Sequence, residues 1–293
     1  MPGSLVPQTS GFGYQLTAEE WDAIIYSPLV GDSAVLSLES IHSHSISGPL
    51  HLPTLDVPVN PTTAFHAAGD EIIPVAATTN EVVLFPRGLK GLKIIVLISN
   101  ETIRSAAADP LSAATEIITK RLTKVVDTAL LAGNSGAGIT GLLPLAGTTI
   151  DASNTTVYPS GSGLNVFTDA LTTSLDAAAD PDVWLVNTRT LGVLMKQKDS
   201  LGRSLLVPNP SQQSTDMLLS RPVVPTPNMP LGTAALIDSS QVHLGVDLEG
   251  QALVLAERYA EFDAIGLRVV SRFDVQVINS PGVVVITGLG PAA

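Results

Sequence analysis

Residues 109–133 are DPLSAATEIITKRLTKVVDTALLAG, and they predict the clearest helix in the chain. Asp109 suits the N-cap position, Pro110 suits the first helical position, and Gly133 with Asn134 ends the helix. At about 1.5 Å per residue the helix is roughly 35 Å long, which is enough to run the length of a subunit. Its apolar residues recur at three- and four-residue steps: Leu111, Ala114, Ile118, Leu122, Val125 and Ala129, widened by Ile117, Val126 and Leu130.

Strands are predicted before this helix. Residues 72–77 and 81–85 flank Thr78-Thr79-Asn80, which we take as the tip of a hairpin, and residues 92–99 form a further strand. A two-stranded ribbon alone is marginally stable in water. We therefore expect this hairpin to lie on a partner surface or on the body of the fold.

A mixed pattern surrounds these segments and predicts the α+β class. A short helix capped by Thr17 is expected to end at Pro28, and the proline-rich residues 45–62 are expected to be extended. Residues 134–163 are expected to form a loop with a short turn, and residues 199–233 loops and short strands. Further helices are predicted over 164–178 and 188–198, and strands over 183–186, 234–237, 241–246, 251–257, 267–279 and 283–287. The strand 267–279 alternates, and we expect its polar residues mostly on the face opposite its apolar ones: Arg268, Arg272, Asp274 and Gln276.

Composition excludes several classes of protein. The 293 residues include 15 Lys and Arg, 27 Asp and Glu and no Cys, so the net charge is −12. An acidic chain does not suit a nucleic-acid binder that is held by phosphate contacts. Without cysteine, disulfide scaffolds and thiol catalysis are excluded. The longest apolar runs are far short of the ~18 residues that span a bilayer, and no secretory signal is predicted.

The acidic charge is concentrated at the N-terminal end. Arg87 is the first basic residue, and the remaining chain is nearly balanced. The preceding acids form either a solvated surface or an arm that lies on a basic surface of another subunit, for which Lys120, Arg121 and Lys124 are suited. These nine acids are Glu19, Glu20, Asp22, Asp32, Glu39, Asp56, Asp70, Glu71 and Glu81.

The candidate chemical sites are weak. The glycine-rich loop of residues 133–141 has no lysine and follows a helix, so it predicts a helix-ending loop and no nucleotide site. His42-Ser-His44 can place both imidazoles on one face of a strand, but it has neither a His-Glu-x-x-His motif nor a cysteine partner. Asp180 and Asp182 flank Pro181 and indicate a turn. We expect no catalytic residue, cofactor or metal.

The order of several motifs resembles the major capsid protein of tailed bacteriophages, which has the Hong Kong 97-type shell fold. The resemblance runs from about residue 65 to the C-terminus, and the order of the motifs is more specific than any one of them. The motifs are GDEIIP at 69–74, VLFPRGLK at 83–90, VLISNE at 96–101, AAAD at 106–109, DTALLAG at 127–133, GLL at 141–143, VWLVNT at 183–188, KDSLGR at 198–203, RPVV at 221–224, NMP at 228–230 and Arg268 with RFD at 272–274.

This resemblance implies a fold and a function. The chain would have an N-terminal arm (1–65), an extended hairpin loop (66–92), a peripheral domain (93–134 and 263–293) with a spine helix at about 109–133, and an axial domain (135–262). Copies would form pentamers and hexamers of an icosahedral virion shell around double-stranded DNA, assembled in the host cytoplasm and without contact to membrane. The candidate inter-subunit contacts are Glu19, Glu20, Asp70, Glu71, Glu81, Arg87, Lys120, Arg121 and Lys124.

Two departures from the family and three alternatives remain. The charged scaffolding segment of some members is absent, so we expect that it was removed or that a separate scaffolding protein acts, beside a portal. Residues 1–86 contain no lysine, so no covalent cross-link is expected at the hairpin tip. The alternatives are an encapsulin-type compartment with protein cargo, a soluble α+β hydrolase or transferase, and a β-rich phage tail or surface protein.

Overall fold

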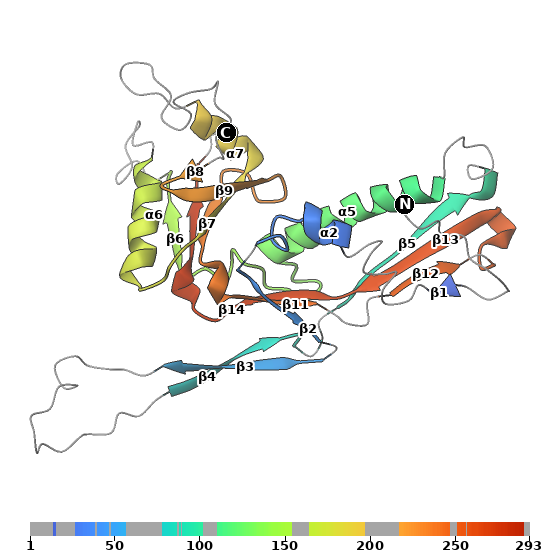
Figure 1. The fold of residues 1–293 in the computed structure, drawn as a ribbon, viewed down its shortest axis with the longest axis horizontal. Coiled ribbons are helices and arrows are strands. Elements are labelled where there is room, and N and C mark those ends of the chain that lie inside the picture. Colours follow the sequence, from blue (N-terminus) through green and yellow to red (C-terminus); the bar gives the residue numbers. More distant parts are fainter. Residues whose placement is uncertain are drawn as a thin grey trace, which may run out of the picture.

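The fold is that of a computed structural model (Figure 1). Two packed regions share the long helix, and a hairpin projects away from them. The structure describes residues 14–15, 27–38, 40–46, 48–56, 78–86, 88, 90–101, 110–153, 164–196, 217–246, 251–255 and 257–289.

Helix α5 (Pro110–Ala132) forms the axis of the first region. Its residues at four-residue steps, Ile118, Leu122, Val126 and Leu130, are at most 5% exposed. They pack toward an antiparallel sheet in the order β1-β12-β13-β5. Its strands are β1 (Tyr14–Gln15), β12 (Gln251–Leu255), β13 (Ala264–Ser271) and β5 (Leu92–Ser99). The predicted helix and the predicted strand at 92–99 are confirmed.

A three-stranded sheet extends the same core. β11 (Val242–Val246) pairs antiparallel with β14 (Phe273–Val277) and parallel with β2 (His42–Ser45). Helix α2 (Ser27–Asp32) contacts α5. The short helix predicted from Thr17 to Pro28 lies mostly outside the described residues. Pro28 itself is in the first turn of α2, where its missing N–H costs no helical hydrogen bond.

Part of the predicted N-terminal arm belongs to the core of this chain itself. Leu29, Val35, Leu36 and Leu38 are buried in the same cluster as the apolar face of α5. Residues 27–46 therefore contribute to this subunit's own fold, because burying large apolar side chains is among the strongest stabilising terms.

The second region is a six-stranded sheet whose strands β7, β10 and β15 are buried on both faces. Its order is β6 (Thr148–Asp151), β15 (Val283–Thr287), β10 (Ala234–Ile237), β7 (Val183–Asn187), β9 (Arg221–Thr226) and β8 (Met217–Leu218). Leu185 and Ile237 point into the core that also contains the apolar face of α5. Trp184 and Leu236 point into a second core with helices α6 (Asn165–Asp176) and α7 (Thr188–Met195). Burial on both faces explains the continuous apolar runs of β7, β10 and β15.

Within the described residues there are also three short 3-10 turns: η2 (Ser239–Gln241), η3 (Ala260–Phe262) and η4 (Ser280–Gly282). Two predictions are wrong here. A strand, β6, lies inside the predicted loop of residues 134–163. The single strand predicted over 267–279 is two strands, β13 and β14, which belong to different sheets. Asp274 on β14 is 1% exposed, and its carboxylate accepts hydrogen bonds from the N–H groups of Phe85 and Val275.

The glycine-rich loop after α5 is a helix-ending loop, as predicted. Gly133 and Gly141 both have φ of +83°, which favours glycine. A Cβ on Gly133 would lie 2.1 Å from the carbonyl oxygen of Thr140, so the two chain segments pass too close for any side chain.

The hairpin consists of β3 (Leu50–Asp56) and β4 (Thr78–Leu84), which pair antiparallel from Leu50 opposite Leu84 to Asp56 opposite Thr78. The predicted tip at residues 78–80 is wrong, since these residues lie within β4. The strand that pairs with β4 comes from the proline-rich segment. Pro53 is tolerated there because, among the described residues, β3 pairs with β4 alone and is an edge strand. The hairpin therefore begins well before residue 66.

Among the described residues, no helix is long and apolar enough to cross a membrane.

Candidate inter-subunit surfaces

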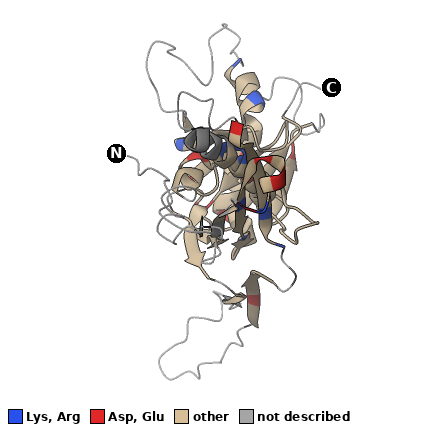
Figure 2. Ribbon diagram, turned by 90° about the vertical axis from the view of Figure 1, so that its right-hand side faces the viewer, with Lys and Arg blue, Asp and Glu red and all other residues tan. Residues whose placement is uncertain are grey.

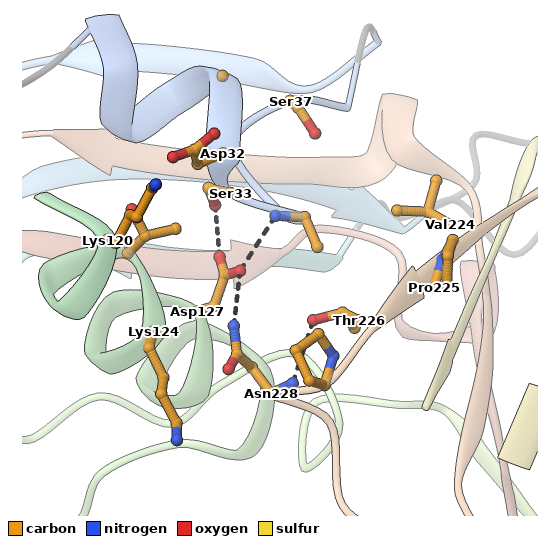
Figure 3. A pocket seen from close by; sticks show the side chains of 14 residues that line it. Asp32, Ser33, Ser37, Lys120, Lys124, Asp127, Val224, Pro225, Thr226 and Asn228 are labelled. Carbon is orange, nitrogen blue, oxygen red and sulfur yellow. Dashed lines mark hydrogen bonds between the residues drawn. The ribbon is translucent and has the colours of Figure 1, made fainter. Parts of the chain in front are cut away.

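A groove of about 490 Å³ opens between α2, α5 and the end of β9, and we call it the α5 groove (Figure 3). Asp127 on α5 organises it. Its carboxylate accepts hydrogen bonds from the Ser33 hydroxyl, from the N–H of Ala34 at 3.1 Å and from Nδ2 of Asn228 at 3.1 Å. Asp127 is 1% exposed, so three segments distant in sequence are joined around one buried acceptor.

Two cations lie at the rim of the α5 groove. Lys120 and Lys124 are one helical turn apart, both are exposed, and both line the groove. Arg121 is exposed on the next face of α5 and does not line it. The structure thus brings two of the three predicted basic residues together at one concave surface.

A second surface is the outer face of β5. The side chains of this strand alternate, so that Ile94 and Val96 pack against the core under α5. Ile95 and Leu97 point the other way and are 44% and 51% exposed. β5 is also the last strand of its sheet among the described residues. Lys93 is exposed on the same side of the strand. Two large exposed apolar side chains beside a strand edge that is unpaired among the described residues are typical of a surface that another chain covers.

The hairpin carries the one predicted acidic contact residue that the structure describes. Glu81 on β4 is exposed and contacts Nδ1 of His51 on β3. The other predicted contacts on the N-terminal side lie outside the described residues: Glu19, Glu20, Asp70, Glu71 and Arg87. Figure 2 shows how sparsely charged residues are placed along the described ribbon.

The remaining described carboxylates near the predicted turn have structural partners. Asp182 accepts a hydrogen bond from the N–H of Ser239 at 3.0 Å, and Asp238 accepts one from the N–H of Asp180 at 3.2 Å. Asn187, in the motif after β7, caps α7 by accepting from the N–H of Arg189 at 2.9 Å. The structure therefore uses these groups to fix turns and a helix start.

Sequence patterns missed the third member of a histidine cluster. His42 and His44 share one face of β2, as predicted, and both lie beside His243 on β11. No local signal could identify His243, because it is 199 residues from His44. In the described part of the chain, no three side chains of His, Asp or Glu are arranged to hold a metal ion.

A scan against family models matches residues 15–288 to the phage capsid family. No curated protein matches the sequence. Among solved structures, the chain is similar to one from Microbacterium phage Oxtober96, with a TM-score of 0.68 and 18% identity over 98% of this chain and 94% of that one. A structure from Mycobacterium phage Bobi has a TM-score of 0.65 and 17% identity over 87% and 90%.

The capsid of an empty GTA particle is similar as well, with a TM-score of 0.64 and 14% identity over 97% of this chain and 95% of that one. The encapsulin alternative is not favoured, because the family model is that of phage capsids. The same family indicates a structural protein. The chain therefore belongs to the phage capsid family and is a major capsid protein with the mixed α+β fold of that family.

Proposed function

We propose that copies of this chain assemble, as pentamers and hexamers, into an icosahedral shell that encloses double-stranded DNA. The projecting hairpin is the observation that carries this proposal (Figure 1). β3 and β4 form a sheet of two strands, and most of their described side chains are exposed or half-buried. Because two strands without a covering layer are marginally stable, a neighbouring copy is the natural partner of the hairpin.

The two packed regions suit the two domains of such a subunit. We assign the six-stranded sheet with α6 and α7 to an axial domain around the local symmetry axis. The long sheet with α5 is assigned to a peripheral domain. Head-to-tail contacts between identical subunits close into rings when the rotation between them closes. Many modest contacts then give a stable shell through multivalency.

The α5 groove is proposed to receive acidic side chains from another subunit. Tyr14–Gln15 pair with β12, and residues 27–46 lie in this chain's own core. The segment proposed to reach a neighbour is therefore shorter than the predicted arm and lies within residues 16–26. It contains Glu19, Glu20 and Asp22 and no basic residue. Each exposed ion pair contributes only about 0.2–1 kcal/mol, so we expect the position of the whole segment to matter more than any one pair.

Net charge supports DNA as a cargo that is enclosed without being gripped. At −12 per chain, the shell repels phosphate on average, and sequence-specific contacts are not expected. We further propose that a separate scaffolding protein and a portal take part in assembly, and that assembly occurs in the host cytoplasm.

Purified particles test this function through their contents. Nuclease-treated particles are examined by negative-stain electron microscopy, and the nucleic acid released after disruption is sized and digested with DNase. We expect closed shells that protect double-stranded DNA. Shells that contain protein cargo and no nucleic acid would contradict the DNA part of the proposal, and a monomer that never assembles would contradict all of it.

A further inference from the structure

Three histidines and the root of the hairpin occupy one face of the three-stranded sheet. In the β2–β11 ladder, His42 lies opposite His243 and His44 lies opposite Gly245. The ring centroid of His243 is 4.9 Å from that of His42 and 5.1 Å from that of His44. The other face of β11, with Val242 and Leu244, belongs to the core.

The pair His44–His243 is joined by a hydrogen bond between ring nitrogens. Nε2 of His44 lies 2.8 Å from Nδ1 of His243, and the ring planes are within 9° of each other. The two nitrogens are 2.8 Å apart and the ring centroids are 5.1 Å apart, so each nitrogen lies on the side of its ring that faces the other ring. One nitrogen must donate an N–H while the other accepts with a lone pair. The contact therefore survives with at most one of the two rings protonated.

Both ends of the hairpin are attached at this face. β2 leads through Ile46, whose N–H donates to the carbonyl of Val246 at 3.0 Å, toward β3. Phe85 follows β4 directly and donates its N–H to Asp274 at 2.9 Å. Its ring lies so close to Gly245 that a Cβ there would be 2.9 Å from it. The histidine cluster thus lies next to the place where the hairpin joins the body.

The charges around the cluster favour neutral imidazoles. Burial, reinforced by His42 and His44, lowers the pKa of His243 to about 4. On β14, the residue opposite His243 is the neutral Gln276, and Asp274 lies opposite Gly245. Burial also raises the pKa of Asp274, against the hydrogen bonds from Phe85 and Val275.

The more distant charged groups lie at the edges of this face. Arg272 precedes β14, and its side chain lies beside Gly91. On the hairpin, His51 and Glu81 contact each other. The largest described influences on His243 are therefore burial and the two other histidines.

We propose that His42, His44 and His243 form a proton-sensitive clasp that holds β2 on β11 at neutral pH and releases it, with the first strand of the hairpin, in acid. The clasp lies within one chain, so it does not depend on the proposed shell. An open clasp exposes His243 and lets it return to its ordinary pKa near 6.5. Between pH 6.5 and about 4 the open form binds more protons, so falling pH favours opening by about tenfold per unit for one proton. Asp274 acts in the opposite direction, because burial raises its pKa in the closed form, which therefore binds this proton more readily than an open form that exposes the carboxylate. The effect of acid on the clasp is therefore assigned to His243.

Hydrogen exchange tests the clasp in the full-length protein, in EDTA so that no metal contributes. Exchange of the peptide that contains residues 41–46 is measured at pH 7.5 and 5.0 and converted to protection factors, with the C-terminal half of α5 as internal reference. In the wild type we expect the protection factor of this peptide to fall by about 30-fold, relative to α5, when the pH is lowered from 7.5 to 5.0. In His243→Gln, whose side chain can hydrogen-bond but does not titrate, the same fall should be no more than about threefold.

His51→Gln is the matched control, since His51 is exposed on the hairpin outside the cluster; it should behave as wild type. Equal protection at the two pH values in the wild type would overturn the proposal, and so would a fall as large in His243→Gln as in the wild type. If His243→Gln does not fold, His44→Gln takes its place. The fall in protection between pH 7.5 and 5.0 should then be large in the wild type and small in His44→Gln, and equal falls would overturn the proposal.

Discussion

Asp127 shows how one buried carboxylate can connect three segments. Its hydrogen-bond donors come from Ser33, Ala34 and Asn228, on both sides of α5 in sequence. In Asp127→Ala these donors lose their acceptor, and we expect a loss of about 3 kcal/mol in the free energy of unfolding. Asp127→Asn keeps the shape and one acceptor oxygen, so its loss should be smaller. Urea unfolding measures both, and equal small effects would show that the network contributes little.

The two lysines of the α5 groove predict an assembly defect. Lys120→Gln with Lys124→Gln removes both groove cations, which lowers the free energy of association by about 1 kcal/mol per contact. We expect the subunit concentration needed for assembly to rise at least fivefold, with the largest difference at low salt. Light scattering during assembly measures this. Arg121→Gln is the comparison, since Arg121 lies outside the groove; a larger defect in Arg121→Gln would move the contact to the other face of α5.

At the scale of elements, the attachment of the hairpin depends on close packing of Phe85 on β11. A methyl group in Gly245→Ala would lie 2.9 Å from the Phe85 ring, so the ring must move. We expect a loss of about 1–3 kcal/mol in the free energy of unfolding and faster hydrogen exchange in β4. Gly192→Ala on α7, where a Cβ meets nothing within 4 Å, should leave stability unchanged or raise it. Similar behaviour of the two variants would show that the Phe85 contact is loose.

Elements with a strong period could be predicted from the sequence, and long-range partners could not. The apolar face of α5 and the alternating side chains of β5 predicted the bounds of these two elements to within one residue. The strand that pairs with β4 was missed because Pro53 makes residues 50–56 look irregular, and only pairing with β4 defines them as a strand. The burial of Asp274 could not be predicted, because one of its hydrogen-bond donors, Phe85, is 189 residues away in sequence.

For the candidate surfaces, sequence spacing placed Lys120 and Lys124 on one side of α5 but could not foresee the groove. The groove is formed by Ser33 and Asn228, which are about 90 and 100 residues from Asp127 in sequence. His42 and His44 were likewise placed correctly on one face of a strand. Their partner His243 depended on a parallel ladder between strands at opposite ends of the chain.

At the scale of the whole molecule, the shell should be held by non-covalent contacts at the hairpin tip. No lysine precedes residue 87, and Lys90 and Lys93 lie beyond the base of the hairpin. Denaturing gels of intact particles, boiled in detergent, should show a monomer near 30.4 kDa. A ladder of covalent multimers would contradict this expectation.

The acidic N-terminal segment should matter for assembly more than for folding. Removal of residues 1–26 takes away β1, which pairs with β12 over only two residues, and leaves α2 and β2 in place. We therefore expect a folded subunit that assembles poorly. Circular dichroism measures the folding, and sedimentation velocity measures the assembly. A version with Glu19, Glu20 and Asp22 changed to the neutral amides separates charge from length. Normal shells from the truncated chain would show that this segment does not link subunits.

A reconstruction of the assembled particle by electron cryo-microscopy tests the central claim most directly. The claim is that the hairpin of residues 50–84 and the apolar face of Ile95 and Leu97 are completed by neighbouring copies. We predict a closed icosahedral shell in which density from an adjacent subunit covers both surfaces of every chain. A shell in which the hairpin stands free in solvent, or a preparation that contains only compact monomers at high concentration, would contradict the claim.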